Sequence, residues 1–136
     1  MEPLVIYYSI FGNNEKFATK IAQDSNYDIV EFNPGTKLRV FQFFMRKKRL
    51  SKKAKNINIH KYSKLKIFGP IWAAKPAPAI IKLLENIGLK EKIVSCFFTY
   101  GQDYGTTENQ VKDIIETNGG ICAEISFRNI DKEKEI

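Results

Sequence analysis

The sequence is poor in the side chains that hold metals or activate nucleophiles. Its 136 residues include one histidine and two cysteines, and Cys96 and Cys122 lack CxxC spacing and a neighbouring histidine. Both cysteines fall within apolar runs, so we expect buried free thiols. A metal centre, a dithiol redox centre and a nucleophile with an oriented base therefore have no support.

Long apolar runs and targeting signals are also missing. No run approaches the ~20 residues that cross a bilayer, and the N-terminus MEPLVIYYS has no basic segment with a cleavage site. We therefore expect a cytoplasmic protein without a transmembrane segment. The length and the hydrophobic fraction of 43% predict a single domain over residues 1–136, in which 128–136 form a short polar tail.

Acidic residues are absent from a long central stretch. Residues 32–84 contain no Asp or Glu, and Lys and Arg are concentrated there, in a chain of formal net charge +7. The most basic part, RKKRLSKKAK at 46–55, predicts either a solvated helix face or a cationic surface for an acidic redox partner, anionic lipid or RNA. No nucleic-acid motif accompanies it, so we expect no DNA partner.

Strand and helix patterns alternate along the chain. Strands are predicted at 4–8, 28–32, 65–68, 92–100 and 121–127, and helices at 14–23, 36–55, 78–87 and from 107 to the NGG at 118–120. Five strands joined by four helical crossovers predict an α/β fold with a doubly wound five-stranded parallel sheet. The loops 9–14, 69–77 and 99–105 then gather at the carboxyl ends of the strands, where such sheets bind ligands.

Local patterns refine three of these elements. Phe17, Ala18, Ile21 and Ala22 share one face of the first helix, and Thr107 with Gln110 has the spacing of a capping box. The last nine residues, RNIDKEKEI, are too short and polar for a covering helix. We therefore expect the fifth helix to be missing or truncated, so that the strand at 121–127 is exposed on one face or forms a dimer contact.

The loop after the first strand, SIFGNN at 9–14, has two readings. It is an ordinary tight turn with an Asn N-cap, or it binds an anion through Ser9, Asn13, Asn14 and the free N–H groups of the helix, with close approach at Gly12.

The other two loops carry aromatic residues. Trp72 lies between prolines in GPIWAAKP and is either a partial plug of the core or an indole left uncovered for a flat ligand. Tyr100 and Tyr104 stand among glycines, either for the opposite face of that ligand or for surface packing. Jointly, the three loops favour a planar aromatic ring with a phosphate tail.

Two other uses of such a sheet are not supported. A phospho-receiver needs carboxylates after the first and third strands, where this chain has SIFGNN and FGPIW, and a P-loop needs GxxxxGK[ST], which is absent.

The stretches VIYYSIFGNNEKFATKIA, FGPIWAAKPAPAIIKLLE and EKIVSCFFTYGQDYGT closely resemble the flavodoxin-like proteins, small FMN-binding flavodoxins included, over roughly residues 3–127. The resemblance implies strand order 2-1-3-4-5 and non-covalent FMN. It assigns the phosphate to the first loop and the isoalloxazine ring to the other two. The implied cofactor-binding residues are Ser9, Ile10, Phe11, Gly12, Asn13, Asn14, Pro70, Ile71, Trp72, Ala73, Thr99, Tyr100, Gly101 and Gly105.

Two functions follow from the resemblance. The favoured one is an FMN-binding redox protein, an electron carrier rather than an FMN-dependent oxidoreductase, which is a monomer or homodimer with an acidic redox partner protein. The alternative is a protein-interaction module that binds FMN weakly or not at all. Phe11 and Asn14 motivate it, because they stand where the family's first loop has threonines.

Overall fold

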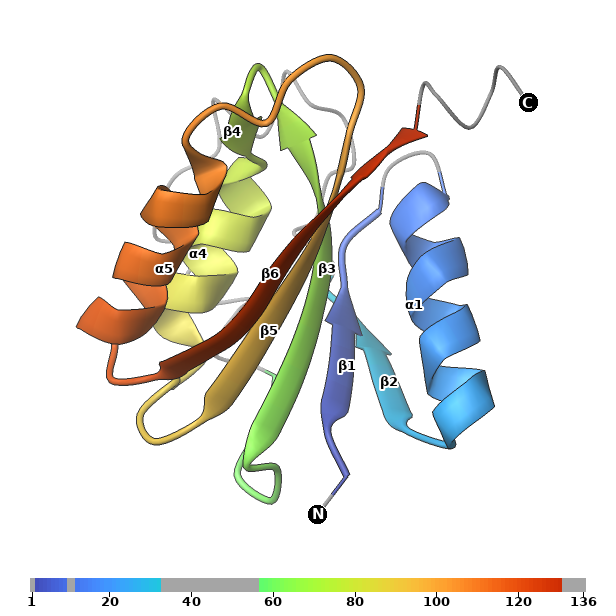
Figure 1. The fold of residues 1–136 in the computed structure, drawn as a ribbon. Helices are drawn as coiled ribbons and strands as arrows, with labels where there is room; N and C mark the ends of the chain where they lie inside the picture. Colours follow the sequence, from blue (N-terminus) through green and yellow to red (C-terminus); the bar gives the residue numbers. More distant parts are fainter. Residues whose placement is uncertain (1, 10–11, 33–56, 131–136) are drawn as a thin grey trace.

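The computed structural model describes residues 2–9, 12–32 and 57–130, which form a sheet between helices (Figure 1). The predicted helix at 36–55, its basic stretch 46–55, Ile10 and Phe11 lie outside the described residues. The elements are β1 (Leu4–Tyr7), α1 (Asn13–Ser25), β2 (Asp28–Glu31), β3 (Lys64–Trp72), β4 (Lys75–Pro76), α4 (Pro78–Asn86), β5 (Ile93–Tyr100), α5 (Thr107–Thr117) and β6 (Ile121–Asn129).

The sheet has the predicted parallel order, β2-β1-β3-β5-β6, and β4 adds a short antiparallel pairing to β3. It is the order 2-1-3-4-5 of the five predicted strands, because β4 is a new two-residue strand. In register, Leu4 of β1 lies between Asp28 and Leu65, and Val94 of β5 lies opposite Leu65. The side chains of these central strands are buried on both faces, which explains their continuous apolar runs.

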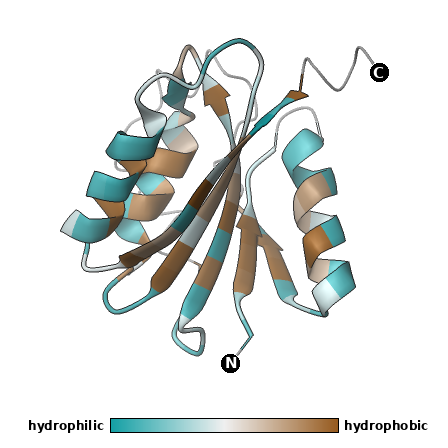
Figure 2. Cartoon of the chain, viewed as in Figure 1, coloured by the Kyte–Doolittle hydropathy of each residue, from teal (hydrophilic) through white to brown (hydrophobic). Residues whose placement is uncertain are grey.

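Helices α4 and α5 lie on one face of the sheet and α1 lies on the other (Figure 1). Pro78 occupies the start of α4, and Gly88, with φ of 95°, follows its end, as predicted. The face of α4 that meets the sheet consists of Ala79, Ile80, Leu83 and Leu84, all buried. Figure 2 shows this hydrophobic side of α4 beside the hydrophobic central strands.

One predicted helix detail is refined and one is wrong. On the predicted face of α1, Ala18 and Ala22 are buried and Phe17 packs partly on the core, whereas Ile21 is 38% exposed. In α5 the N-cap is Thr106 and no side chain caps the helix, so Thr107 and Gln110 do not form a capping box. The Thr107 side chain lies inside the first turn, where it is buried against the core.

Strand β6 is half-exposed, as predicted, and none of its residues is fully buried. It continues two residues beyond the predicted end, so residues 128 and 129 belong to the sheet and not to the tail, whose residues 131–136 lie outside the described part. A bulge opposite Val94 and Ser95 shifts the register, so that Ile121 is 57% exposed while Ile125 and Phe127 pack on the core.

Both cysteines are free. Cys96 is buried as expected, whereas Cys122 is only half-buried on β6, and burial raises the pKa of both thiols. No helix within the described part of the chain combines the length and apolarity that crossing a bilayer requires.

Candidate functional site

A cavity of about 180 Å³ lies where β1, β3 and β5 end and α1 begins. We call it the rim cavity, and it brings together residues from all three predicted loops. It is lined by Ser9, Asn13, Asn14, Pro70, Ile71, Trp72, Thr99, Tyr100, Gly101 and Ile130. Among the described lining residues, Ile130, which follows β6, was not indicated by the sequence, because it was assigned to the tail. Gly12, Ala73 and Gly105 lie nearby in the chain but do not line the cavity.

Helix α1 opens onto this cavity without a side-chain cap. Its N-cap residue is Gly12, whose φ of 87° favours glycine, and the first intrahelical bond runs from the Lys16 N–H to the Gly12 carbonyl at 3.0 Å. The N–H groups of the turn before Lys16 therefore lack intrahelical acceptors. The Ser9 hydroxyl oxygen accepts the Gly12 N–H at 3.0 Å, which closes the turn and leaves the hydroxyl proton of Ser9 to donate.

The amide of Asn14 joins the start of α1 to the end of β5. It is 2% exposed, and its Nδ2 donates to the Thr99 hydroxyl at 2.9 Å, while its Oδ1 has no hydrogen-bond partner among the described residues. Asn14 and Thr99 were both predicted at the site, and the structure pairs them. This bond fixes two of the three loops relative to one another, although they are 85 residues apart in sequence.

Trp72 is buried, which decides between the two readings of this indole in favour of the core plug. Its side chain is 6% exposed. Its ring and the ring of Tyr8 form a T-shaped pair, with the ring centres 5.9 Å apart and the ring planes at 74°. The reason is that β3 continues through GPIW, which was predicted as a turn, and carries Trp72 into the core. The indole is therefore the core plug that the sequence left open, and it still forms one wall of the rim cavity.

A tight hairpin turn follows Trp72. Strands β3 and β4 pair Trp72 with Lys75, and the two residues between them, Ala73 and Ala74, have φ of 53° and 62°. These left-handed angles are those of a type I′ turn, in which glycine or asparagine is usual. Each alanine there carries a conformational cost of about 1–2 kcal/mol. The turn next to the rim cavity is therefore strained.

The loop 101–105 packs against this turn. A Cβ on Gly105, whose φ is 55°, would lie 2.6 Å from the Ala74 carbonyl oxygen, so the contact requires glycine. The rings of Tyr104 and Tyr100 form a T-shaped pair with their centres 4.9 Å apart. Tyr104 also stacks on Phe127, with the ring centres 4.1 Å apart. Of the two roles left open for these tyrosines, the structure shows packing for Tyr104, whereas Tyr100 also lines the cavity.

Comparison with solved structures finds the same arrangement over nearly the whole chain. A flavoprotein from Lactobacillus acidophilus in complex with FMN aligns with a TM-score of 0.68 and 20% identity, covering 98% of this chain and 97% of that one. The fold is flavodoxin-like. A Bacteroides uniformis protein aligns with a TM-score of 0.74 and 19% identity over 99% and 98% of the two chains.

A Fusobacterium nucleatum flavodoxin bound to flavin mononucleotide is a more distant flavodoxin-like match, with a TM-score of 0.58 and 18% identity over 90% of this chain and 70% of that one. No protein-family model and no curated protein matches the sequence. The comparisons therefore establish the flavodoxin-like fold.

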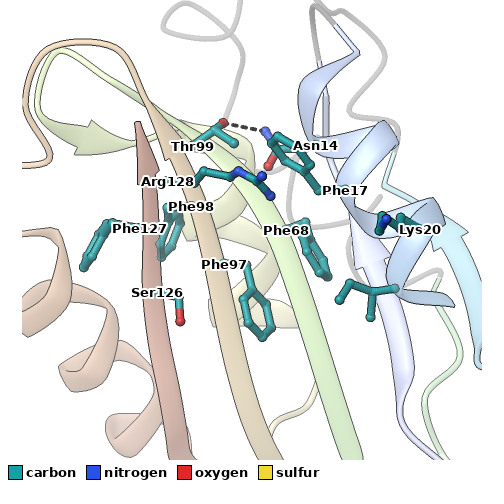
Figure 3. A pocket seen from close by; sticks show the side chains of 11 residues that line it. Asn14, Phe17, Lys20, Phe68, Phe97, Phe98, Thr99, Ser126, Phe127 and Arg128 are labelled. Carbon is teal, nitrogen blue, oxygen red and sulfur yellow. Dashed lines mark hydrogen bonds between the residues drawn. The ribbon is translucent and has the colours of Figure 1, made fainter. Parts of the chain in front are cut away.

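A second cavity, which the sequence did not indicate, lies on the α1 face of this flavodoxin-like sheet (Figure 3). We call it the aromatic groove, and its volume is about 360 Å³. It is lined by Asn14, Phe17, Lys20, Ile21, Phe68, Phe97, Phe98, Thr99, Ser126, Phe127 and Arg128. Of the described residues, Asn14 and Thr99 line both this groove and the rim cavity. The sequence features most closely related to this groove are the predicted exposure of the strand at 121–127 and the predicted absence or truncation of the fifth helix.

The groups that line the two cavities are mainly amides, hydroxyls, aromatic rings and, in the aromatic groove, cations. Within residues 2–9, 12–32 and 57–130, no group of three or more His, Cys, Asp or Glu side chains could hold a metal ion. What the rim cavity offers is a helix N-terminus, hydroxyl and amide groups, and aromatic walls.

Proposed function

We propose that this chain binds FMN non-covalently at the rim cavity and transfers electrons through it. The observation that carries the proposal is the position of that cavity: it joins an uncapped helix N-terminus to aromatic walls at the carboxyl edge of a flavodoxin-like sheet. The FMN-bound proteins with the same fold support this choice of ligand.

The phosphate of FMN would be held at the start of α1. The N–H groups of Asn13 and Asn14 point out of the helix end, and the hydroxyl of Ser9 and the side-chain amide of Asn13 add donors. The positive end of the helix dipole favours a dianion at this position. These groups fit a phosphate, and Gly12 brings the backbone close to it.

The ring of FMN would lie between Pro70, Ile71, Trp72 and Ala73 on one side and Thr99, Tyr100, Gly101 and Gly105 on the other. When bound, FMN supplies one- and two-electron transfer, and the protein orients the ring and sets its potential through nearby backbone groups. The volume of 180 Å³ lies below the usual range of ligand pockets, about 300–1,000 Å³. FMN bound there would therefore extend beyond the cavity rather than be enclosed by it.

The packing of Trp72 and the small volume of the rim cavity favour a second candidate function. Because Trp72 is packed against Tyr8 and the cavity is small, the alternative is a protein-interaction module that binds FMN weakly or not at all. For the favoured function we propose a redox partner with an acidic docking surface, because the formal charge of the chain is +7, and a place in the cytoplasm.

Titration of the purified protein with FMN and with riboflavin tests the proposal. Flavin fluorescence should be quenched on binding, and riboflavin should bind at least about tenfold more weakly because it lacks the phosphate. Asn13→Ala should weaken FMN by about tenfold without changing the affinity for riboflavin. Asn109→Ala on the exposed side of α5 is the matched control and should change neither.

Two results would reject FMN binding at the rim cavity. One is unchanged flavin fluorescence at a large excess of protein, which would favour the interaction module. The other is equal affinity for FMN and riboflavin in the parent and in Asn13→Ala, which would show that the phosphate does not meet the start of α1.

A further inference from the structure

The aromatic groove has the size and the walls of a ligand site. Its volume of about 360 Å³ lies within the usual range for small-molecule pockets. Phe68 and Phe97, opposite each other on β3 and β5, stack face to face with their ring centres 4.8 Å apart and their planes at 18°, and Phe17 of α1 also lines the groove. Phe17 and Phe97 are only half-buried, so their rings are available to a planar molecule (Figure 3).

The two charged side chains among the described lining residues, Lys20 and Arg128, are both positive. The guanidinium carbon of Arg128 lies 4.0 Å from the centre of the Phe17 ring, which links β6 to α1, the helix that carries Lys20. Lys66, which is not a lining residue, lies over the Phe97 ring with its Nζ 5.4 Å from the ring centre. No Asp or Glu is among the described lining residues, and the neighbouring Glu124 accepts a hydrogen bond from Ser126. The groove therefore favours an anion.

A buried polar atom also faces this groove. Asn14 is 2% exposed and its Oδ1 has no partner among the described residues, although its Nδ2 is satisfied by Thr99. In Figure 3 the oxygen of Asn14 points away from Thr99, toward Arg128 and Phe17. A buried acceptor without a donor is costly, so an N–H group from a ligand would stabilise this arrangement.

We propose that the aromatic groove binds a planar aromatic anion that also carries an N–H donor. The ring lies against Phe68 and Phe97, the anion meets Arg128 and Lys20, and the N–H donates to Asn14 Oδ1. A second copy of the chain is a poorer occupant, because two such grooves facing each other would bring Lys20 and Arg128 close to their own copies. The groove is a separate cavity from the rim cavity, although Asn14 and Thr99 line both.

Three probes separate the elements of this recognition. Indole-3-acetate has a flat ring, a carboxylate and a ring N–H; 1-naphthaleneacetate lacks the N–H, and tryptamine replaces the anion with a cation. Titrations followed by ¹H–¹⁵N NMR should shift the amides of Phe97, Ser126 and Arg128 with indole-3-acetate. Tryptamine should bind at least about tenfold more weakly, and 1-naphthaleneacetate several-fold more weakly.

Variants then locate the binding. Ser126→Phe fills the groove from a half-exposed strand position and should lower the affinity for indole-3-acetate at least tenfold. Ser95→Phe, on β5 and outside the groove, is the matched control and should leave the affinity unchanged. Arg128→Gln should weaken indole-3-acetate about tenfold and tryptamine little. Dispersed NMR spectra of each variant confirm that it is folded.

Three results would overturn the proposal. Shifts confined to Trp72, Tyr100 and Gly101 would place the probe in the rim cavity, and so would its displacement by FMN together with full affinity in Ser126→Phe. Equal affinities for indole-3-acetate and tryptamine would remove the charge argument. A dimer in light scattering that Ser126→Phe converts to a monomer would show that a second copy covers the groove. Failure of FMN to bind leaves this test unaffected.

Discussion

The two faces of the sheet are built differently among the described residues. The face under α4 and α5 belongs to a continuous core in which Ile80, Leu83, Leu84, Val111 and Ile115 are completely buried. The face under α1 has a core of four residues, Val5, Ala18, Ala22 and Phe68. Two of these four are alanines, so α1 approaches the sheet closely but buries little side-chain surface.

The difference separates stability from binding. Large aliphatic side chains interdigitate on the α4 and α5 face, where any loss of volume leaves a cavity. On the α1 face, Phe17 and Phe97 are half-buried and Ile21 is 38% exposed, beside the aromatic groove. One face therefore fixes the fold, whereas the other leaves aromatic rings partly exposed.

Matched truncations on the two faces should give the largest contrast. Leu83→Ala removes a completely buried side chain of α4 and should lower the free energy of unfolding by about 2–5 kcal/mol. Ile21→Ala removes a 38% exposed side chain of α1 and should cost less than about 1 kcal/mol. Urea unfolding of both variants measures the difference. Equal losses would mean that both faces contribute alike.

The packing of β3 against α4 predicts a second, smaller effect. A Cβ on Gly69 would lie 2.5 Å from Cδ1 and Cγ1 of Ile80, so Gly69→Ala should cost about 1–3 kcal/mol through overpacking. Ile80→Ala removes Cδ1 and Cγ1 and leaves the Cβ of residue 80 at 3.8 Å from the added Cβ, so it should relieve the clash. The double variant should then lose less stability than the sum of the two single variants. Additive losses would contradict close packing at this point.

The strained hairpin beside the rim cavity predicts a gain in stability. Ala74→Gly removes the cost of a φ of 62° and should raise the free energy of unfolding by roughly 0.5–1 kcal/mol, after the greater chain entropy of glycine is included. Ala123→Gly, at an exposed position where φ is not positive, is the control and should be destabilising. Thermal unfolding of both variants separates strain relief from a general effect of glycine.

The sequence predicted the order of the sheet because two periodicities alternate along the chain and crossover connections are right-handed. It did not predict the length of β3, because Gly69 and Pro70 are typical of a turn. Proline is tolerated there because the pairing of β1 with β3 ends at Phe68, and the Pro70 carbonyl accepts the Ala77 N–H at 3.0 Å. Partner strands, not the local pattern, decide where β3 ends.

The candidate site was also predicted only in part, because local sequence patterns do not specify what packs against each residue. Ser9, Asn13, Thr99 and Tyr100 were predicted at the rim because carboxyl ends of parallel strands meet there, and the structure brings them to one cavity. The burial of Trp72 and the exposure of Ile21 depend on what covers each position in space. Spacing along a helix or strand identifies a face, but it does not say whether another element packs on that face.

Ionisation of Tyr7 should give the smallest effect, and it tests the α1 face directly. Partial burial, the carboxylates of Glu31 and Glu15, and a hydrogen bond of 3.2 Å to Glu31 raise the pKa of Tyr7 from 10.0 to about 12. Because the folded pKa is raised, the folded state favours the neutral phenol. This contribution is complete below pH 10 and is lost as the pH rises through about 12.

Tyr7→Phe cannot ionise, so its free energy of unfolding should fall less steeply than that of the parent between pH 10 and 12. Ultraviolet absorbance at alkaline pH should also show that the parent has one more late-titrating phenol than the variant. Tyr62, whose hydrogen bond to Asp28 raises its pKa as well, remains in both proteins and does not affect the difference. Parallel stability curves would show that water screens Tyr7 from Glu31, and hence that the α1 face is more open than its packing indicates.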